Sequence, residues 1–125
     1  MKDVQAIIRQ NMVNKTKRAL AEADISSFTA TGNVLGRGKG LVDAKVLKAA
    51  SEGSVEAIEQ LSKGPRLYPK RLLSIVVPDE KVKLVVNTII KANQTGNPGD
   101  GKIFVLPVTE AVRVRTGEDG DAVLD

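Results

Sequence analysis

The sequence predicts a single α+β domain in which two helices pack on one face of a four-stranded sheet. The 125 residues suffice for one domain and are too few for two ordinary ones. Segments with strand and helix patterns follow one another in the order strand, helix, strand, strand, helix, strand. We therefore take residues 1–125 as one domain, which ends in a polar tail over 117–125.

The first half of the chain supplies a strand, a helix and a second strand. Residues 2–9, KDVQAIIR, predict the first strand. Asn14 is a residue type that caps helices, and alanine and leucine recur at helical spacing after it, which predicts a helix over 16–23. Residues 28–34, FTATGNV, predict the second strand.

The second half repeats this order. Residues 70–77, KRLLSIVV, predict a strand that ends at Pro78, and Asp79 is expected to cap the following helix. The apolar face of that helix consists of Val82, Val85, Val86, Ile89 and Ile90. Residues 103–108, IFVLPV, predict the last strand, and VRVR at 112–115 predicts a short extended piece.

Two such units in tandem predict a ferredoxin-like βαββαβ sandwich with both helices on one face of the sheet. In residues 72–77 and 103–108, both alternating sets of side chains are largely apolar. Strands of this kind are usually buried on both faces, whereas a two-layer domain covers only one. We therefore expect an oligomer in which the uncovered sheet faces meet at the centre. The alternative is an open sheet with an irregular pattern.

A long loop, approximately residues 38–68, separates the second and third strands. A segment without strands, 41–66, is unusual in a small domain and indicates either function or disorder. Two short helical faces are expected there after Asp43 and Ser54, made of Ala44, Val46, Leu47 and Ala50, and of Val55, Ile58 and Leu61. Such short helices are marginal alone, so we expect them to fold against a partner; the alternative is packing on the body.

The composition excludes several kinds of chemistry. The sequence contains neither Cys nor His, which removes disulfides, thiol and imidazole catalysis, and typical zinc or copper sites. Mg²⁺ remains compatible, because it binds oxygen and often accompanies nucleotide phosphates. There is no run of 18 apolar residues and no signal-peptide pattern, so we expect a cytoplasmic protein without stable membrane insertion.

Positive charge is concentrated in one segment. Residues 36–71 contain eight Lys and Arg against four acidic residues, which accounts for the whole net charge of +4. Such an excess indicates an anionic ligand or partner, or simply a solvated surface.

Three clusters combine glycine with basic residues: LGRGKG at 35–40, TGNPGDGK at 95–102 and RVRTGE at 113–118. Glycine lets backbone N–H groups approach a phosphate, and Lys or Arg supplies the opposite charge. Arg113 and Arg115 are two residues apart, so on a strand they would point the same way. The spacing matches neither a Walker motif nor a Rossmann fingerprint. Each cluster alone could be a simple turn, but together they predict phosphate binding.

The stretch QTGNPGDGKIFVLPVTEAVRVRTGE, residues 94–118, closely resembles the signature of the PII nitrogen regulatory proteins (GlnB/GlnK-like). AIIR, ALAEA, the strand that starts near Thr29 and SIVVPDEKV also match, and only about 41–66 is not covered. The resemblance implies a non-enzymatic homotrimer that binds ATP or ADP with Mg²⁺ in clefts between subunits. It also implies that the protein senses 2-oxoglutarate as an effector.

The resemblance further implies individual site residues. Phosphate contacts fall on Gly99, Asp100, Gly101 and Lys102, and on Arg113 and Arg115 from the neighbouring subunit. Thr29 and Val76 would border the adenine, and Gly36, Arg37, Gly38 and Lys39 would close over the phosphates. Residues implied for 2-oxoglutarate are Lys70, Lys39 and Gly40. No side chain is implied as a metal ligand, because Mg²⁺ would be held by the phosphates.

The chain departs from the family pattern at three places. Gly40 stands where the family usually has a Gln that helps to hold Mg²⁺ and 2-oxoglutarate, and Ser74 stands where a Glu often lies near the adenine. Tyr68 lies at the base of the long loop and not at its tip, so control by uridylylation is not expected.

The GRGKG motif and the long loop resemble the nitrogenase-associated NifI branch, and more its second paralogue. That branch is implied to inhibit nitrogenase by direct contact, with a paralogue as a further potential member of the assembly. An alternative is a general PII regulator of an ammonium transporter or glutamine synthetase.

Two further alternatives come from other classes. An RRM-like RNA-binding module would need aromatic side chains on QAIIR and LLSIVV, which contain none, so we expect no nucleic-acid partner. An acylphosphatase-like hydrolase would need an acid–base pair that the motifs lack.

Overall fold

The computed structural model describes residues 1–38, 51–56, 58 and 66–125. Lys39, Gly40 and the first helical face expected in the long loop lie outside the described residues. The main elements are β1 (Lys2–Arg9), α1 (Val13–Glu22), β2 (Thr29–Gly36), β3 (Tyr68–Val77), α4 (Val82–Asn93) and β4 (Lys102–Pro107). Short 3-10 turns span Gln10–Met12, Asp79–Lys81 and Asp121–Val123. The predicted order of strands and helices is confirmed.

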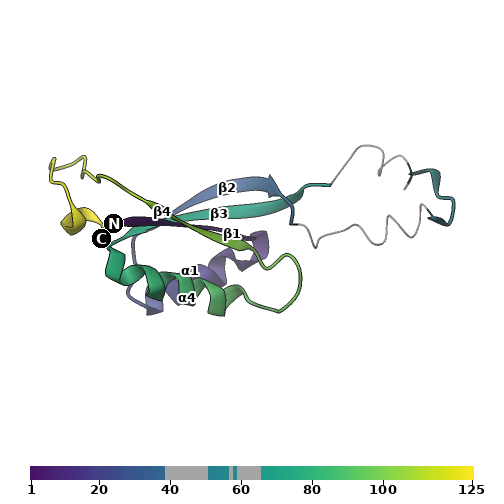
Figure 1. The fold of residues 1–125 in the computed structure, drawn as a ribbon, viewed down its shortest axis with the longest axis horizontal. Coiled ribbons are helices and arrows are strands. Elements are labelled where there is room, and N and C mark those ends of the chain that lie inside the picture. Colours follow the sequence, from purple (N-terminus) through teal and green to yellow (C-terminus); the bar gives the residue numbers. More distant parts are fainter. Residues whose placement is uncertain (39–50, 57, 59–65) are drawn as a thin grey trace.

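The four strands form one antiparallel sheet in the order β2-β3-β1-β4, and α1 and α4 lie on the same face of it (Figure 1). This arrangement is the predicted ferredoxin-like fold. The core lies between the sheet and the helices and is aliphatic. Its fully buried members are Val4, Ala6, Ile8, Leu20, Leu73, Ile75, Val85 and Ile89. No helix in the described part of the chain is long and apolar enough to cross a membrane.

The sheet face opposite the helices is apolar at its sides and polar at its centre. The strand register puts Leu72, Ser74 and Val76 of β3, Asp3, Gln5 and Ile7 of β1, and Phe104 and Leu106 of β4 on this face. The Ser74 hydroxyl donates a hydrogen bond to Asp3 at 2.7 Å, and the Gln5 amide donates to the same carboxylate at 3.0 Å. The two-sided apolarity predicted for residues 72–77 and 103–108 therefore holds for much of β3 and β4, with Ser74 as the polar exception, whereas β1 places polar side chains on this face.

Both predicted helix caps are wrong. Met12 occupies the cap position of α1, and Asn14 lies inside its first turn. Lys81 occupies the cap position of α4, whereas Asp79 begins the preceding 3-10 turn and pairs with the N-terminal ammonium group at 3.0 Å. The hydrogen bond from that ammonium group lowers the pKa of Asp79. Each helix is entered through a 3-10 turn, whose i→i+3 bonds satisfy backbone groups that a side-chain cap would otherwise serve.

β2 and β3 continue past the predicted ends and pair as far as Gly36 and Tyr68. We call residues 37–67, which connect these two strands, the arm, and the paired ends of β2 and β3 its root. Ile58 in the arm donates its N–H to the Ser54 carbonyl at 3.1 Å, and Val55, Glu56 and Ile58 are helical. The helical start expected after Ser54 is thus present in the described residues.

The extended piece predicted at 112–115 is mostly a turn. Val112 forms one isolated bridge with Asp119, and the Gly117 N–H donates to the Arg113 carbonyl at 2.7 Å. The inference that Arg113 and Arg115 share one face of a strand is therefore wrong. Gly117 has a φ of +73°, which allows the chain to reverse at once.

Candidate functional site

A cavity of 260 Å³ lies where the arm leaves the sheet, between the arm root, β1 and the glycine-rich loop that precedes β4. It is lined by Ile7, Gly36, Arg37, Gly38, Lys70, Gly99, Gly101, Lys102 and Phe104. Seven of the predicted site residues thus line the same cavity. Its volume is below the roughly 300–1,000 Å³ typical of small-molecule pockets.

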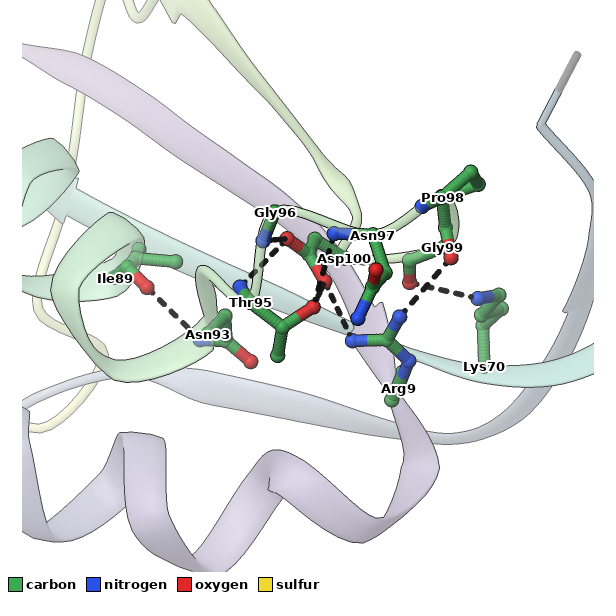
Figure 2. Close-up of polar contacts among 10 residues, drawn as sticks. All are labelled: Arg9, Lys70, Ile89, Asn93, Thr95, Gly96, Asn97, Pro98, Gly99 and Asp100. Atoms are coloured by element: carbon green, nitrogen blue, oxygen red, sulfur yellow. Dashed lines mark hydrogen bonds and ion pairs between the residues drawn. The ribbon is translucent and has the colours of Figure 1, made fainter. Parts of the chain in front are cut away.

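The glycine-rich loop is organised around the Asp100 carboxylate (Figure 2). This carboxylate accepts the N–H of Thr95 at 2.7 Å and the N–H of Gly96 at 3.0 Å, and it also accepts the Thr95 hydroxyl. Arg9, at the end of β1, pairs with it at 2.7 Å. The bonds from Thr95, followed by that from Arg9, hold the pKa of Asp100 far below its usual range. The carboxylate is therefore ionised at neutral pH and is directed into the loop.

Gly101 brings the loop against β1. It has a φ of +123°, and a Cβ at this position would lie 2.2 Å from the Ile7 carbonyl oxygen. Only glycine fits such a conformation and such a close approach. The contact fixes the start of β4, where Lys102 pairs with Ile7 and lines the cavity.

Lys70 joins the arm root to the glycine-rich loop. Its side chain is buried, and its Nζ donates to the Gly99 carbonyl at 3.2 Å (Figure 2). Burial, followed by the nearby charge of Arg9, lowers the pKa of Lys70. A cation held in this way is available to an anion that enters the cavity, because a carboxylate is a better partner for it than a neutral carbonyl.

A hydrogen bond connects the two sides of the arm next to its root. Arg37 donates to the Arg66 carbonyl at 3.4 Å, and the Arg66 guanidinium lies 5.5 Å from the centre of the Tyr68 ring. A Cβ added to Gly38 would meet no described atom within 4 Å. Gly38 also lines the cavity.

The two arginines that the resemblance assigns to the phosphate site of a neighbouring subunit lie away from the cavity of their own chain. Ile7 pairs with Lys102 at the cavity end of β4, but Lys2 pairs with Pro107 at its other end. The segment that carries Arg113 and Arg115 leaves from that second end and lies beside the N-terminus (Figure 1). Thr29 and Val76 also lie outside the cavity lining. Among the described residues, the cavity lining of one chain therefore lacks five of the predicted site residues, namely Thr29, Val76, Asp100, Arg113 and Arg115.

Arg113 is occupied by the C-terminal segment. Its guanidinium lies 3.7 Å from Glu118 and 3.9 Å from Asp125, and it donates to the Ala122 carbonyl at 3.4 Å. These contacts are long and partly exposed, so they hold the side chain only weakly.

Arg9 was not among the site residues predicted from the sequence. It belongs to no glycine cluster, and its partner Asp100 is 91 residues away along the chain. The available signal was a basic residue that ends an apolar strand, which by itself indicates nothing about a ligand. Only the register that sets Ile7 opposite Lys102 brings Arg9 to the glycine-rich loop.

The fold and the cavity define a ferredoxin-like domain with a basic, glycine-lined site at the root of an arm. The model of the family described as "Nitrogen regulatory protein P-II" matches residues 1–118, and the chain belongs to this family of signalling proteins. Its members generally bind ATP or ADP and 2-oxoglutarate, and trimers are typical of them.

Similar proteins from two organisms are both named "Nitrogen fixation nifHD region GlnB-like protein 2". The one from Methanobacterium ivanovii is 47% identical over 99% of this chain and 100% of its own length. The one from Methanothermococcus thermolithotrophicus is 46% identical over 99% and 98%. The solved structure of Arabidopsis thaliana PII bound to citrate matches with a TM-score of 0.72 and 32% identity, and it covers 98% of this chain and 88% of that one.

Proposed function

We propose that this chain is a nucleotide-dependent regulator of nitrogen fixation that binds ATP or ADP at the cavity, senses 2-oxoglutarate and inhibits nitrogenase by direct contact. One observation carries the proposal. Lys70 and Lys102 converge with the glycines of two separate loops on a single cavity.

The cavity suits the phosphate part of a nucleotide. Lys102 supplies a charge at its edge, Gly38 lines it, and Gly99 and Gly101 expose backbone beside it. Such a combination of N–H groups and ammonium groups is a general solution for phosphate. Mg²⁺ would enter with the phosphates, since it usually takes few ligands from a protein and several from phosphate or water.

A trimer would complete the site. Arg113 and Arg115 lie at the other end of the sheet from the cavity, so a neighbouring chain is the source from which they would reach the phosphates. The open sheet face, with Phe104 47% and Leu106 40% exposed, would be covered in the same assembly. A paralogue with the same sheet face could replace one or more copies.

2-Oxoglutarate is proposed to bind beside Lys70, where its carboxylate would replace the Gly99 carbonyl as the partner of the ammonium group. Lys39 and Gly40 would complete this subsite. The Arabidopsis relative is described as bound to citrate, also a carboxylic acid, which supports carboxylate recognition in the family.

The target is proposed from the relatives and the arm together. Proteins 46–47% identical to this chain are named for a nitrogen-fixation region, which favours nitrogenase over an ammonium transporter or glutamine synthetase. The arm and its root expose large apolar side chains, at Leu35 (66%), Val55 (68%), Ile58 (50%) and Leu67 (53%). Exposed apolar side chains on a projecting segment suit contact with another protein.

Calorimetric titration of the purified protein with Mg-ATP, with and without 2-oxoglutarate, tests this function. We expect ATP binding that 2-oxoglutarate strengthens, and inhibition of nitrogenase that both ligands together relieve. Absence of ATP binding would overturn the proposal. Binding of ATP without any effect on nitrogenase would overturn the target alone.

A further inference from the structure

We propose that Arg9 and Asp100 are positioning residues that hold the glycine-rich loop, residues 95–101, in the shape that receives phosphate. The inference rests on the proposed nucleotide site. It gives Asp100 a role within the loop and introduces Arg9, which no motif singles out.

The Asp100 carboxylate ties the loop to itself and to β1. It accepts hydrogen bonds from the backbone N–H groups of Thr95 and Gly96 at one end of the loop. From the sheet, Arg9 pairs with it at 2.7 Å. A second N–H group of the same guanidinium donates to the Pro98 carbonyl at 3.1 Å. Arg9 thus contacts the loop at two points, the Asp100 carboxylate and the Pro98 carbonyl, through two N–H groups of its planar guanidinium. The ammonium group of a lysine could not reproduce this geometry.

These hydrogen bonds determine the direction of backbone N–H groups in the loop. Arg9 and Lys70 hold two successive carbonyls, those of Pro98 and Gly99 (Figure 2). In a trans peptide the C=O and the following N–H point in opposite directions, and the described chain contains no cis peptide. The N–H group of Gly99 therefore points away from Arg9, and that of Asp100 points away from Lys70. Successive backbone N–H groups fixed in this way can form a concave site for an anion.

The charge of Asp100 makes the role testable. A carboxylate near the proposed phosphates repels them, so an effect through charge alone predicts that Asp100→Asn strengthens ATP binding and Arg9→Gln weakens it. A positioning role predicts that both substitutions weaken it. An amide at position 100 has one acceptor oxygen and an NH2 group, so it cannot accept from Arg9 and from both N–H groups together.

The experiment measures ATP affinity calorimetrically for the intact wild-type protein, Arg9→Gln, Asp100→Asn and the double variant. Titrations in EDTA exclude an effect of Asp100 through Mg²⁺. We expect each single substitution to weaken binding about ten-fold, and the double variant to be little worse than either, because the two side chains act as one unit. Arg18→Gln, which removes the same charge from the exposed surface of α1, is the matched control and should bind ATP normally.

Amide hydrogen exchange provides a readout that does not depend on ATP. In Asp100→Asn, the N–H groups of Thr95 and Gly96 should exchange at least about ten-fold faster, while the protection of the core strands and the melting temperature change little. If Arg9→Gln does not fold, Arg9→Lys takes its place. That variant keeps the charge but loses the fork, and it should still weaken ATP binding.

The outcomes separate the two proposals. Stronger binding by Asp100→Asn, or unchanged binding by both single variants of a wild type that binds ATP, would overturn the positioning role alone. A wild type that does not bind ATP would overturn the proposed function, and the positioning role would fall with it.

Discussion

At the scale of residues, the cavity depends on a few charged side chains. Two of them, Lys70 and Asp100, are held in place by hydrogen bonds or an ion pair within the protein. Lys70 is buried against a carbonyl, and Asp100 is surrounded by donors. Lys102 lies exposed at the start of β4 and lines the cavity. Charged groups that are held in place before a ligand arrives lose little entropy when it binds.

We predict that Lys102→Ala weakens ATP binding about ten-fold or more, because a charge-assisted contact to phosphate contributes roughly 1.5–3 kcal/mol. Calorimetry measures the affinity. Lys17→Ala, an exposed lysine of α1, is the control for the loss of one charge and should bind as wild type. Equal affinities for the two variants would contradict the assignment of Lys102.

We predict that Lys70→Met retains ATP binding but loses the dependence of that binding on 2-oxoglutarate. Methionine fills similar space in β3 without the ammonium group that a carboxylate needs. The measurement is the ratio of ATP affinities with and without 2-oxoglutarate, which should fall to about one. Lys91→Met on α4 should keep the wild-type ratio. A ratio above one in Lys70→Met would show that the effector binds elsewhere.

At the scale of elements, the arm and the glycine-rich loop meet at the cavity. The arm root is Gly36 paired with Tyr68, and Lys70 links that root to Gly99 of the loop. We propose that a ligand bound between them contacts both. By linkage, a protein bound to the arm would then change the affinity for that ligand by the same factor as the ligand changes the affinity for the protein.

We predict that replacement of residues 43–64 by a short Gly/Ser link leaves a protein that binds ATP but no longer captures or inhibits nitrogenase. The arm carries the proposed contact, whereas the described cavity residues lie outside the deleted range. A pull-down and a nitrogenase activity assay measure the two effects. Full inhibition by the shortened protein would place recognition on the body.

A point variant tests the same idea with the arm intact. Ile58→Ser removes an apolar side chain that is 50% exposed, and Leu84→Ser removes one on α4 that is 47% exposed. We expect only Ile58→Ser to weaken nitrogenase capture, because only this side chain lies on the arm.

At the scale of the whole molecule, one chain is incomplete in two respects. Its sheet has one face without helices, and the basic residues of the predicted site lie toward opposite ends of that sheet, with Lys70 and Lys102 at one end and Arg113 and Arg115 beyond the other. Asp3, Gln5 and Ser74 satisfy one another at the centre of the open face, so a partner can cover this polar cluster without leaving its bonds unmade.

We predict a trimer in solution that Leu106→Asp dissociates to monomers, because the substitution would bury a charge in the contact between sheet faces. Light scattering measures the mass. Ile90→Asp on α4 is the matched control, since Ile90 is 42% exposed and Leu106 is 40% exposed. Ile90→Asp should remain a trimer. A wild-type monomer at micromolar concentration, or an intact trimer of Leu106→Asp, would contradict the prediction.

The sequence by itself determined the order of strands and helices, because alternation and helical spacing are local patterns that each element carries within itself. It also marked Gly99, Gly101 and Lys102, since glycine beside a basic residue is recognisable over a few positions. The predicted helix caps were wrong because a 3-10 turn precedes each helix. The capping side chain that the local pattern favoured is therefore not at the start of the helix.

Tertiary structure alone decided how distant residues combine. Strand register joined Arg9 to Asp100 and Lys70 to Gly99, and it gave β1 a polar centre on a face that β3 and β4 make apolar. It also placed Arg113 away from the cavity of its own chain, which agrees with the expectation that this residue serves the site of a neighbouring subunit. The physical reason is that these contacts depend on which strands pair and in which register, and no short segment of sequence contains that information.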